Sequence, residues 1–209
     1  MKPFTNLLPW KHCSLESSPV LSNVRKHISL TSEEEGYFIS LLKERVVQRK
    51  ECIVNAGEAC AAIYFVEQGA LRAYYRDSKD NENVIMFAIN DWWITDMYSF
   101  VNEKPAVLSI DALEESTILQ LNKKDFDQLF SNVPKFERFF RILMQNAYVR
   151  EQLRSVENLS MPAADRYDNF LKKYPQFAQR VPLKQIASYL GITPEFLSLL
   201  RKRTAKGIS

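Results

Sequence analysis

The central part of the chain, between Val46 and Leu121, consists of short apolar runs that are separated by turn residues. The runs that read as β-strands are Arg45–Gln48, Cys52–Val54, Ile63–Val66, Ala70–Tyr75, Val84–Ile89, Val107–Ile110 and Thr117–Leu121. Turn signals lie between several of them, such as the segments that end at Gly57 and Gly69. Many short strands at this spacing predict a β-sandwich or a β-barrel.

Helical patterns stand on both sides of this β region. Before it, Thr31 or Ser32 precedes three glutamates, which marks the start of a helix with acidic residues in its first turn. The buried stripe of that helix comprises Phe38, Leu41 and Leu42. After the β region, we expect a short helix over Asp125–Phe130 and a long helix from Lys135 to about Leu159.

The long helix carries a row of residues at alternating spacings of three and four, which is typical of a coiled-coil seam. The members of this row are Phe139, Ile142, Asn146, Val149, Leu153 and Val156. Its single polar member is an asparagine, the residue that fixes register in many coiled coils. A second apolar strip contains Phe136, Phe140, Leu143 and Ala147. Because a helix that is apolar on two sides needs two partners, we expect it to pack on its own β domain and on a second copy. A helix that packs only on its own domain is the alternative.

The segment from Val181 to Arg203 divides into two helical runs around a tight turn. The apolar face of the first run comprises Leu183, Ile186, Ala187 and Leu190. Gly191 then stands where a helix end needs a residue that tolerates positive φ. Thr193 is positioned to cap the second helix, and Pro194 suits its first position. The pattern predicts a helix-turn-helix whose second helix is able to enter a DNA major groove, with an ordinary pair of antiparallel helices as the alternative.

The distribution of charge favours DNA binding. From Pro162 to Ser209 the chain has nine Lys and Arg against three Asp and Glu, a net charge of +6. Because the whole chain carries +3, residues 1–161 carry −3. A basic tail on a mildly acidic body is typical of a nucleic-acid reader that is attached to another domain.

The bulk composition is that of a soluble globular protein, with 209 residues of which 46% are hydrophobic and 25% are charged. No apolar run approaches the roughly 20 residues that span a bilayer, so we expect no membrane contact. The chain has three cysteines, an odd and widely spread set that favours a reducing compartment over a disulfide framework. We therefore expect a cytoplasmic protein.

Residues 1–29 contain scattered prolines and polar residues and are interpreted as a loosely ordered N-terminal arm. His12 and Cys13 are adjacent in this arm, but one residue of each kind is too few for a metal site. No nucleophile–base pair and no pair of carboxylates stands out elsewhere in the sequence. We therefore expect no catalytic site, no metal site and no enzymatic activity.

The stretch from Ile53 to Gly69 looks like the first signature of cyclic nucleotide-binding domains. It contains an early strand, the Gly-acid turn Gly57-Glu58, a run of four apolar residues and a further glycine. A β-roll, a long helix and a C-terminal helix-turn-helix together resemble the Crp/Fnr family of bacterial transcription regulators. The resemblance covers most of the chain, from about residue 30 to residue 203.

This resemblance implies an α+β fold with three parts after the arm. The first is a jelly-roll (double-stranded β-helix) domain of the cyclic-nucleotide-binding-like kind at residues 30–134. The second is a dimerisation helix at residues 135–160, and the third is a helix-turn-helix domain at residues 161–209. The partners that it implies are double-stranded DNA, a second copy of the chain and RNA polymerase.

Relatives that bind cAMP carry a second cassette, in which a Glu accepts the ribose hydroxyl and an Arg-Ser pair holds the cyclic phosphate. The matching positions here are Thr95, Asp96, Lys104, Ala106 and Val107. Asp96 is able to accept a hydroxyl, whereas Ala106 and Val107 offer the phosphate neither charge nor a side-chain hydrogen bond. Lys104 is the only nearby cation, and it is a point charge rather than a bidentate fork. These residues argue against cAMP and leave another small effector, or none, as the alternatives.

Haem and iron–sulfur clusters, which other relatives use as sensors, are not supported either. Cys13, Cys52 and Cys60 lack cluster-ligand spacing, and His12 and His27 are the only histidines. We therefore expect no cofactor.

The positions that contact bases in relatives correspond to Pro194, Glu195 and Leu199. Glu195 is able to accept a hydrogen bond from a cytosine amine, and Leu199 is able to contact a thymine methyl group. The remaining candidates are Thr193 and Ser198 for phosphate or base, and Arg201, Lys202 and Arg203 for phosphate, which positions a protein without specifying sequence.

The hypothesis from the sequence is a homodimeric DNA-binding transcription regulator of Crp/Fnr type that reads a palindromic site. Two alternatives stay open. One is a DNA-binding protein whose β-roll holds no ligand and serves as a scaffold, which the incomplete phosphate cassette favours. The other is a small-molecule or protein-interaction module that does not read DNA, which the sparse set of base-contacting residues allows.

Overall fold

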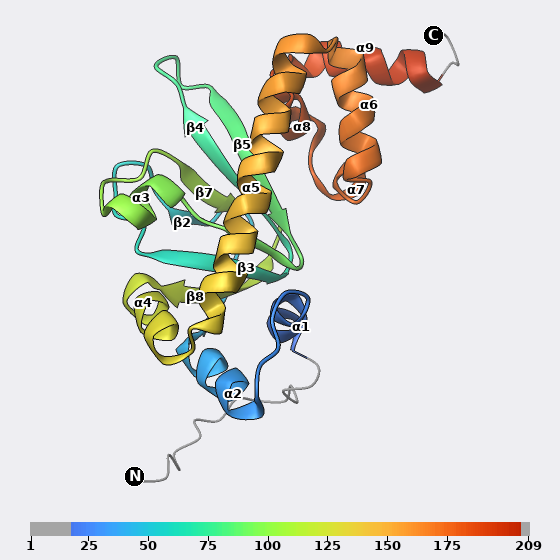
Figure 1. Ribbon diagram of the computed structural model, residues 1–209. Coiled ribbons are helices and arrows are strands. Elements are labelled where there is room, and N and C mark those ends of the chain that lie inside the picture. Colours follow the sequence, from blue (N-terminus) through green and yellow to red (C-terminus); the bar gives the residue numbers. More distant parts are fainter. Residues whose placement is uncertain (1–17, 206–209) are drawn as a thin grey trace, which may run out of the picture.

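Two antiparallel four-stranded sheets form the body of the molecule, as seen in a computed structural model that describes residues 18–205 apart from the side chains of Ala178 and residues 203–205 (Figure 1). In spatial order, the first sheet contains β1 (Lys43–Val47), β8 (Ser116–Asn122), β3 (Ala62–Gln68) and β6 (Trp92–Ile94). The second sheet contains β2 (Cys52–Val54), β7 (Ser109–Ala112), β4 (Ala70–Arg76) and β5 (Glu82–Ile89). This arrangement confirms the predicted jelly-roll. The sequence pattern missed β6, which is too short to show an alternation.

Strand β3 is buried on both of its faces and therefore connects two cores. Successive side chains of a strand point to opposite sides. Tyr64 and Val66 point into the cluster between the two sheets, whereas Ile63 and Phe65 point into a second cluster on the outer side of the first sheet. This burial explains why the strand reads as a continuous apolar run rather than as an alternating one.

Gly69 connects β3 to β4 at a place where a side chain has no room. Its φ is +112°, and an added Cβ would lie 2.0 Å from the Oγ atom of Ser116. That hydroxyl accepts a hydrogen bond from the backbone N–H of Ala70 at 3.1 Å and donates one to the carbonyl of Glu114 at 2.9 Å. Only glycine allows this turn to close against β8.

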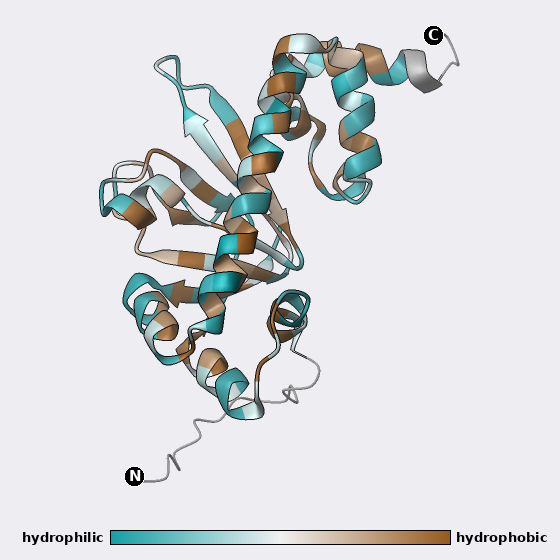
Figure 2. Ribbon diagram, viewed as in Figure 1, coloured by the Kyte–Doolittle hydropathy of each residue, from teal (hydrophilic) through white to brown (hydrophobic). Residues whose placement is uncertain are grey.

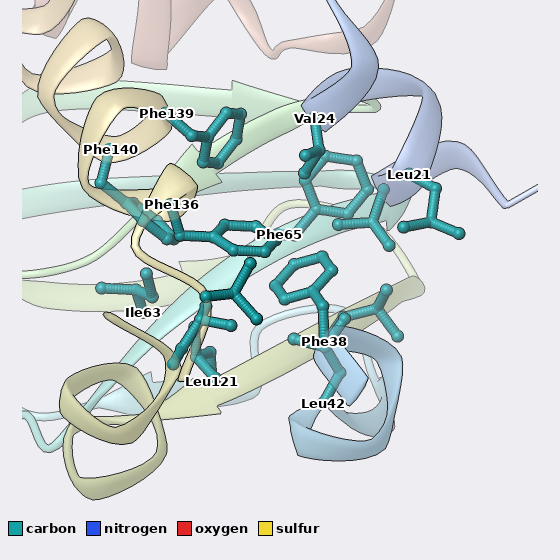
Figure 3. Packing of buried hydrophobic residues seen from close by; sticks show 14 of the residues in the cluster. Leu21, Val24, Phe38, Leu42, Ile63, Phe65, Leu121, Phe136, Phe139 and Phe140 are labelled. Atoms are coloured by element: carbon teal, nitrogen blue, oxygen red, sulfur yellow. The ribbon is translucent and has the colours of Figure 1, made fainter. Parts of the chain in front are cut away.

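Four helices cover the outer side of the first sheet. They are α1 (Pro19–Arg25), α2 (Ser32–Leu41), α4 (Lys123–Asn132) and the first turns of α5 (Lys135–Ser160). Figure 3 shows Phe38 of α2, Phe65 of β3 and Phe136 of α5 packed together, with the rings of Phe38 and Phe136 4.6 Å apart. The predicted start of α2 is confirmed, because Thr31 accepts a hydrogen bond from the N–H of Glu34 and donates its own N–H to the Glu34 carboxylate.

Two sequence predictions are wrong at this core. The N-terminal arm was predicted to be loosely ordered, but residues 19–25 form a helix whose Val20, Leu21 and Val24 are fully buried. Residues 1–17 of the predicted arm, including His12 and Cys13, lie outside the described residues. Phe139 was predicted to lie on the dimer seam, but it is fully buried against the β-roll because the first turns of α5 lie on the sheet.

The remaining helices follow the β-roll, except for α3 (Met97–Asn102), which lies between β6 and β7. The C-terminal unit comprises α6 (Ala163–Lys173), α7 (Phe177–Arg180), α8 (Leu183–Tyr189) and α9 (Pro194–Ala205). The pattern predicted α4, α5, α8 and α9, but it missed α3 and α7, which are short. Among the residues described, no helix has both the length and the apolar composition that a membrane span requires.

The N-terminal helix provides a test of this core. Leu21→Ala should lower the free energy of unfolding by about 2–5 kcal/mol, because the leucine is fully buried and its loss leaves a cavity. Ser22→Ala, an exposed change on the same helix, should stay within about 0.5 kcal/mol of wild type. Urea unfolding followed by circular dichroism measures both, and equal effects would contradict the placement of α1 in the core.

Candidate functional site

The turn between α8 and α9 has the hydrogen bonds of a complete Schellman motif. Gly191 adopts φ +66°, and its N–H donates to the carbonyl of Ser188 at 3.1 Å. The N–H of Ile192 donates to the carbonyl of Ala187 at 3.0 Å. This geometry ends α8 sharply and redirects the chain into α9, as the sequence predicted for this glycine.

Helix α9 begins at a capped end and exposes one face. The N–H of Phe196 donates to the hydroxyl of Thr193 at 3.2 Å, which confirms the predicted cap. Leu197 and Leu200 are buried against the rest of the unit. The predicted DNA-contacting side chains that are exposed are those of Thr193, Glu195, Leu199, Arg201 and Lys202.

Other predicted DNA contacts on α9 are less available. Pro194 is half-buried, and the hydroxyl of Ser198 donates to the carbonyl of Pro194 at 2.8 Å. The side chain of Arg203 lies outside the described residues. Sequence reasoning missed Phe196, which is 43% exposed beside Leu199, itself 45% exposed. The spacing of three between these two residues on the outer face was the available signal.

The helix-turn-helix unit is docked on the hairpin of β4 and β5 through a shared apolar cluster. From the roll, this cluster includes Tyr74, Val84, Phe87 and Ile89. From the C-terminal unit, it includes Tyr167, Phe170, Phe177, Ile186 and Ala187. The unit predicted as residues 161–209 therefore does not have a core separate from that of the roll. Figure 1 shows α8 beside the long hairpin.

Hydrogen bonds fix α8 to the free edge of β5. The hydroxyl of Ser188 accepts from the N–H of Val84 at 2.9 Å and donates to the carbonyl of Glu82 at 2.7 Å. The backbone of the edge strand β5 is thus hydrogen-bonded to a side chain of α8 at the place where a further strand could otherwise pair. Helix α9, which follows α8, consequently takes its position from the β-roll.

A buried arginine reinforces this docking. Arg72 of β4 donates to both carboxylate oxygens of Asp111, at 2.7 and 2.8 Å. Its Nη1 atom donates to Glu82 at 2.7 Å and to Gln185 of α8 at 2.6 Å. Burial alone would lower the pKa of Arg72, but the hydrogen bonds to Asp111 and Glu82 outweigh burial and raise that pKa above its ordinary value.

The outer half of α5 exposes the predicted dimer seam. Val149, Leu153 and Val156 are 51%, 51% and 54% exposed, and Asn146 is exposed in the same row. Ile142 is half-buried at the start of the row. Figure 2 shows apolar bands alternating with polar ones along this helix. Phe136, Phe140 and Leu143 of the second strip pack on the β-roll as predicted.

In the predicted ligand cassette, the carboxylate of Asp96 is bound by the chain's own backbone. Asp96 is 1% exposed and caps α3, where its Oδ1 atom accepts from the N–H of Ser99 at 3.0 Å. Its Oδ2 atom accepts from the N–H groups of Val107 and Leu108, at 2.7 and 2.8 Å. Asp96 therefore closes the whole loop between β6 and β7. Its position before a short apolar run was an N-cap signal that sequence reasoning did not use.

The other cassette residues do not converge on an open site. The hydroxyl of Thr95 donates to the carbonyl of Ala62 at 2.8 Å, and Ala106 is buried. Lys104 and Val107 are exposed. Within residues 18–205, no group of three or more His, Cys, Asp or Glu side chains is placed to hold a metal ion.

Comparison with known proteins identifies the β-roll. Residues 44–133 match the family model of the cyclic nucleotide-binding domain. This segment is therefore similar to cyclic nucleotide-binding domains. It begins in β1 and ends just after α4, so it contains both sheets and the loop that Asp96 closes.

The similarity to known proteins extends beyond this segment. The transcriptional regulatory protein Btr of Bordetella pertussis is 26% identical over 204 residues, covering 92% of this chain and 82% of that protein. The structure of FixK2 from Bradyrhizobium japonicum has a TM-score of 0.70 at 17% identity and covers 80% of this chain and 86% of that one. A transcriptional regulator of the Crp/Fnr family from Eubacterium rectale has a TM-score of 0.66 at 14% identity, with 85% of each chain covered. The resemblance to Crp/Fnr regulators that the sequence predicted is confirmed.

In this β-roll, the carboxylate of Asp96 occupies backbone amides that face the cassette. A cyclic phosphate placed against Val107 would meet a negative charge already bound to the same amides. The phosphate and the carboxylate of Asp96 would repel each other, and neither Ala106 nor Val107 supplies a compensating cation. The local chemistry therefore does not fit a bound cyclic phosphate.

The role of Asp96 as a loop closure leads to a stability prediction. Asp96→Ala should lower the free energy of unfolding by about 2–3 kcal/mol, because three backbone N–H groups lose a charged acceptor. Lys104→Ala, an exposed change in the same loop, should have an effect below about 0.5 kcal/mol. Denaturant unfolding measures both variants.

The same unfolding experiment with added cAMP distinguishes loop closure from ligand binding. We expect no shift of the wild-type midpoint, since a ligand stabilises only the state that binds it. A stabilisation by cAMP that is lost in Asp96→Ala would show that this carboxylate contacts the ligand instead.

Proposed function

We propose that the chain is a homodimeric transcription regulator that reads a palindromic DNA site through α8 and α9. The observation that carries the proposal is the helix-turn-helix itself, with its Schellman turn at Gly191, its capped second helix and the exposed face of α9. Glu195 and Leu199 would contact base edges, and Arg201 and Lys202 would contact phosphates. The net charge of +6 from Pro162 to Ser209 supports approach to DNA.

Dimerisation would occur along the exposed seam of α5. Val149, Leu153 and Val156 lie at heptad spacing and are half exposed, so a second copy of α5 would bury them. Asn146 would set the register. Two recognition helices related by a twofold axis would then read half-sites about 34 Å apart.

Within this function, we favour a β-roll that does not take a cyclic nucleotide. The support is the internal carboxylate of Asp96, together with the absence of a cation at Ala106 and Val107. The roll would then be a scaffold that positions α5 and α8. A cytoplasmic location, expected from the cysteines, and contact with RNA polymerase, implied by the resemblance, stay predictions from the sequence.

Selection of bound fragments from a genomic DNA library, followed by gel shifts, tests DNA reading. A palindromic site should be recovered, and changing its half-site spacing by half a helical turn should abolish specific binding.

Glu195→Ala should relax discrimination at one base pair of each half-site, by about 1–3 kcal/mol. Lys202→Gln should instead weaken binding to all sequences and reduce the salt slope by about 1. Binding that ignores spacing and collapses with salt would mean phosphate attraction alone.

Sedimentation equilibrium tests the dimer seam. Leu153→Asp should convert the dimer to a monomer while the far-UV circular dichroism stays unchanged, because the leucine is exposed in the single chain. Gln152→Asp adds the same charge on the neighbouring, also exposed position outside the seam and should leave the dimer intact. A wild-type chain that is monomeric at every concentration measured would contradict this part of the proposal.

A further inference from the structure

A cleft opens between the long helix α5 and two helices of the DNA-reading unit, α6 and α8. Its cavity volume is about 30 Å³, which is room for about two water molecules, and part of it is open to solvent. Its charged lining comprises Arg150, Arg154 and Glu157 of α5 with Arg166 and Lys173 of α6. Tyr189 of α8 contributes an aromatic wall. Figure 1 shows α6 and α8 on one side of the β-roll and α3, which Asp96 caps, on the other.

The two arginines of α5 are mostly buried and have few acceptors. Among the described residues, the hydrogen-bond acceptor of Arg150 is the weak thioether sulfur of Met86, at 3.9 Å. Arg154 donates to the carbonyl of Ile85 and stacks 4.7 Å from the ring centre of Tyr189. Glu151 lies 3.8 and 3.6 Å from the two guanidinium groups, which gives an ion pair without a short hydrogen bond. Since each guanidinium has five N–H donors, most of them stay available.

The arginine of α6 has a donor that is buried without a partner. Arg166 donates from Nη1 to the carbonyl of Met161 at 2.9 Å and from Nη2 to the carbonyl of Leu190 at 3.1 Å. Its Nε atom is buried and has no acceptor among the described residues. An unpaired buried donor costs about 1–3 kcal/mol, so an acceptor that enters the cleft would relieve that cost.

These observations define the chemistry of the missing partner. Four cations border the cleft, whereas Glu157 is its only acidic lining residue in the described part of the chain, and Glu151 already lies beside two of the arginines. Guanidinium forks match the oxygens of a phosphate group, which accepts several hydrogen bonds at once. We propose that this cleft binds a small phosphate-bearing molecule, held by Arg150, Arg154, Arg166 and Lys173.

Such a ligand would act on the geometry of the proposed regulator. It would bridge α5, which carries the dimer seam, and α6, which begins the DNA-reading unit. A ligand that joins two parts of a molecule stabilises the arrangement in which both contribute contacts. This regulatory role rests on the proposed function, whereas binding itself does not, and binding is therefore measured without DNA.

Isothermal titration of the full chain at constant ionic strength tests the cleft, with inorganic phosphate and AMP as the probes. Lys173→Gln should weaken binding about three- to tenfold, since one charged hydrogen bond is lost. Glu157→Gln should tighten binding by a similar factor of about three to ten, because a repelling charge is removed. Lys172→Gln is the matched control: it removes the same charge from the neighbouring exposed position, outside the cleft, and should change affinity less than about twofold.

The outcomes separate the sources of binding. Equal affinity for the two probes means that the phosphate group supplies the recognition, and tighter binding of AMP means that the aromatic wall adds contacts. No binding of either probe at millimolar concentration overturns the proposal, as does an equal loss in Lys172→Gln and Lys173→Gln. If instead only the salt slope of DNA binding falls in Lys173→Gln, the cleft is a contact for DNA phosphate and the proposal also fails, while DNA reading survives.

Discussion

The arrangement of the molecule depends on one buried cation, Arg72 of β4. A charge inside a protein is tolerated only when its donors are paired, and loss of one partner from such a pair costs about 3–5 kcal/mol. The partners here are Asp111 of β7, Glu82 of β5 and Gln185 of α8. The hydrogen bonds of this one guanidinium therefore connect three strands of the second sheet to α8, the first helix of the helix-turn-helix. The position of α9 follows from the roll rather than from the short connection at Met161.

Helix α5 serves three parts of the structure along its length. Its first turns belong to the core on the outer side of the first sheet, where Phe136 and Phe139 are fully buried. Its outer half carries the exposed row around Leu153, and another side borders the cleft through Arg154. Because a packed helix moves as a rigid element, a displacement of α5 at any of these contacts also displaces it at the others. Under the proposed function, this helix is where effector, dimer and DNA are coupled.

Elements with strong local signals were predictable from the sequence. The capping box at Thr31, the glycine at Gly191 and the long apolar periodicity of α5 each act within a few residues, and the structure confirms them. The elements that were missed are short or atypical. Strand β6 has 3 residues, α7 has 4 and α3 has 6, which is too few to establish a period. Helix α1 was missed because Pro19 and its polar neighbours indicate a loop, whereas tertiary burial stabilises it.

By itself, the sequence determined the jelly-roll, the long helix, the helix-turn-helix and the lack of a cationic phosphate clamp at Ala106 and Val107. Only the tertiary structure decided how these parts use their side chains. Asp96, interpreted as a ligand for a ribose, binds amides 11 and 12 residues further along the chain. Phe139 fits the seam by spacing and yet belongs to the core, and Arg166 lines a cleft between α5, α6 and α8. Hydrogen bonding and periodicity are local and can be read along the chain, whereas a side chain's partner depends on which distant segments the packing of the cores brings beside it.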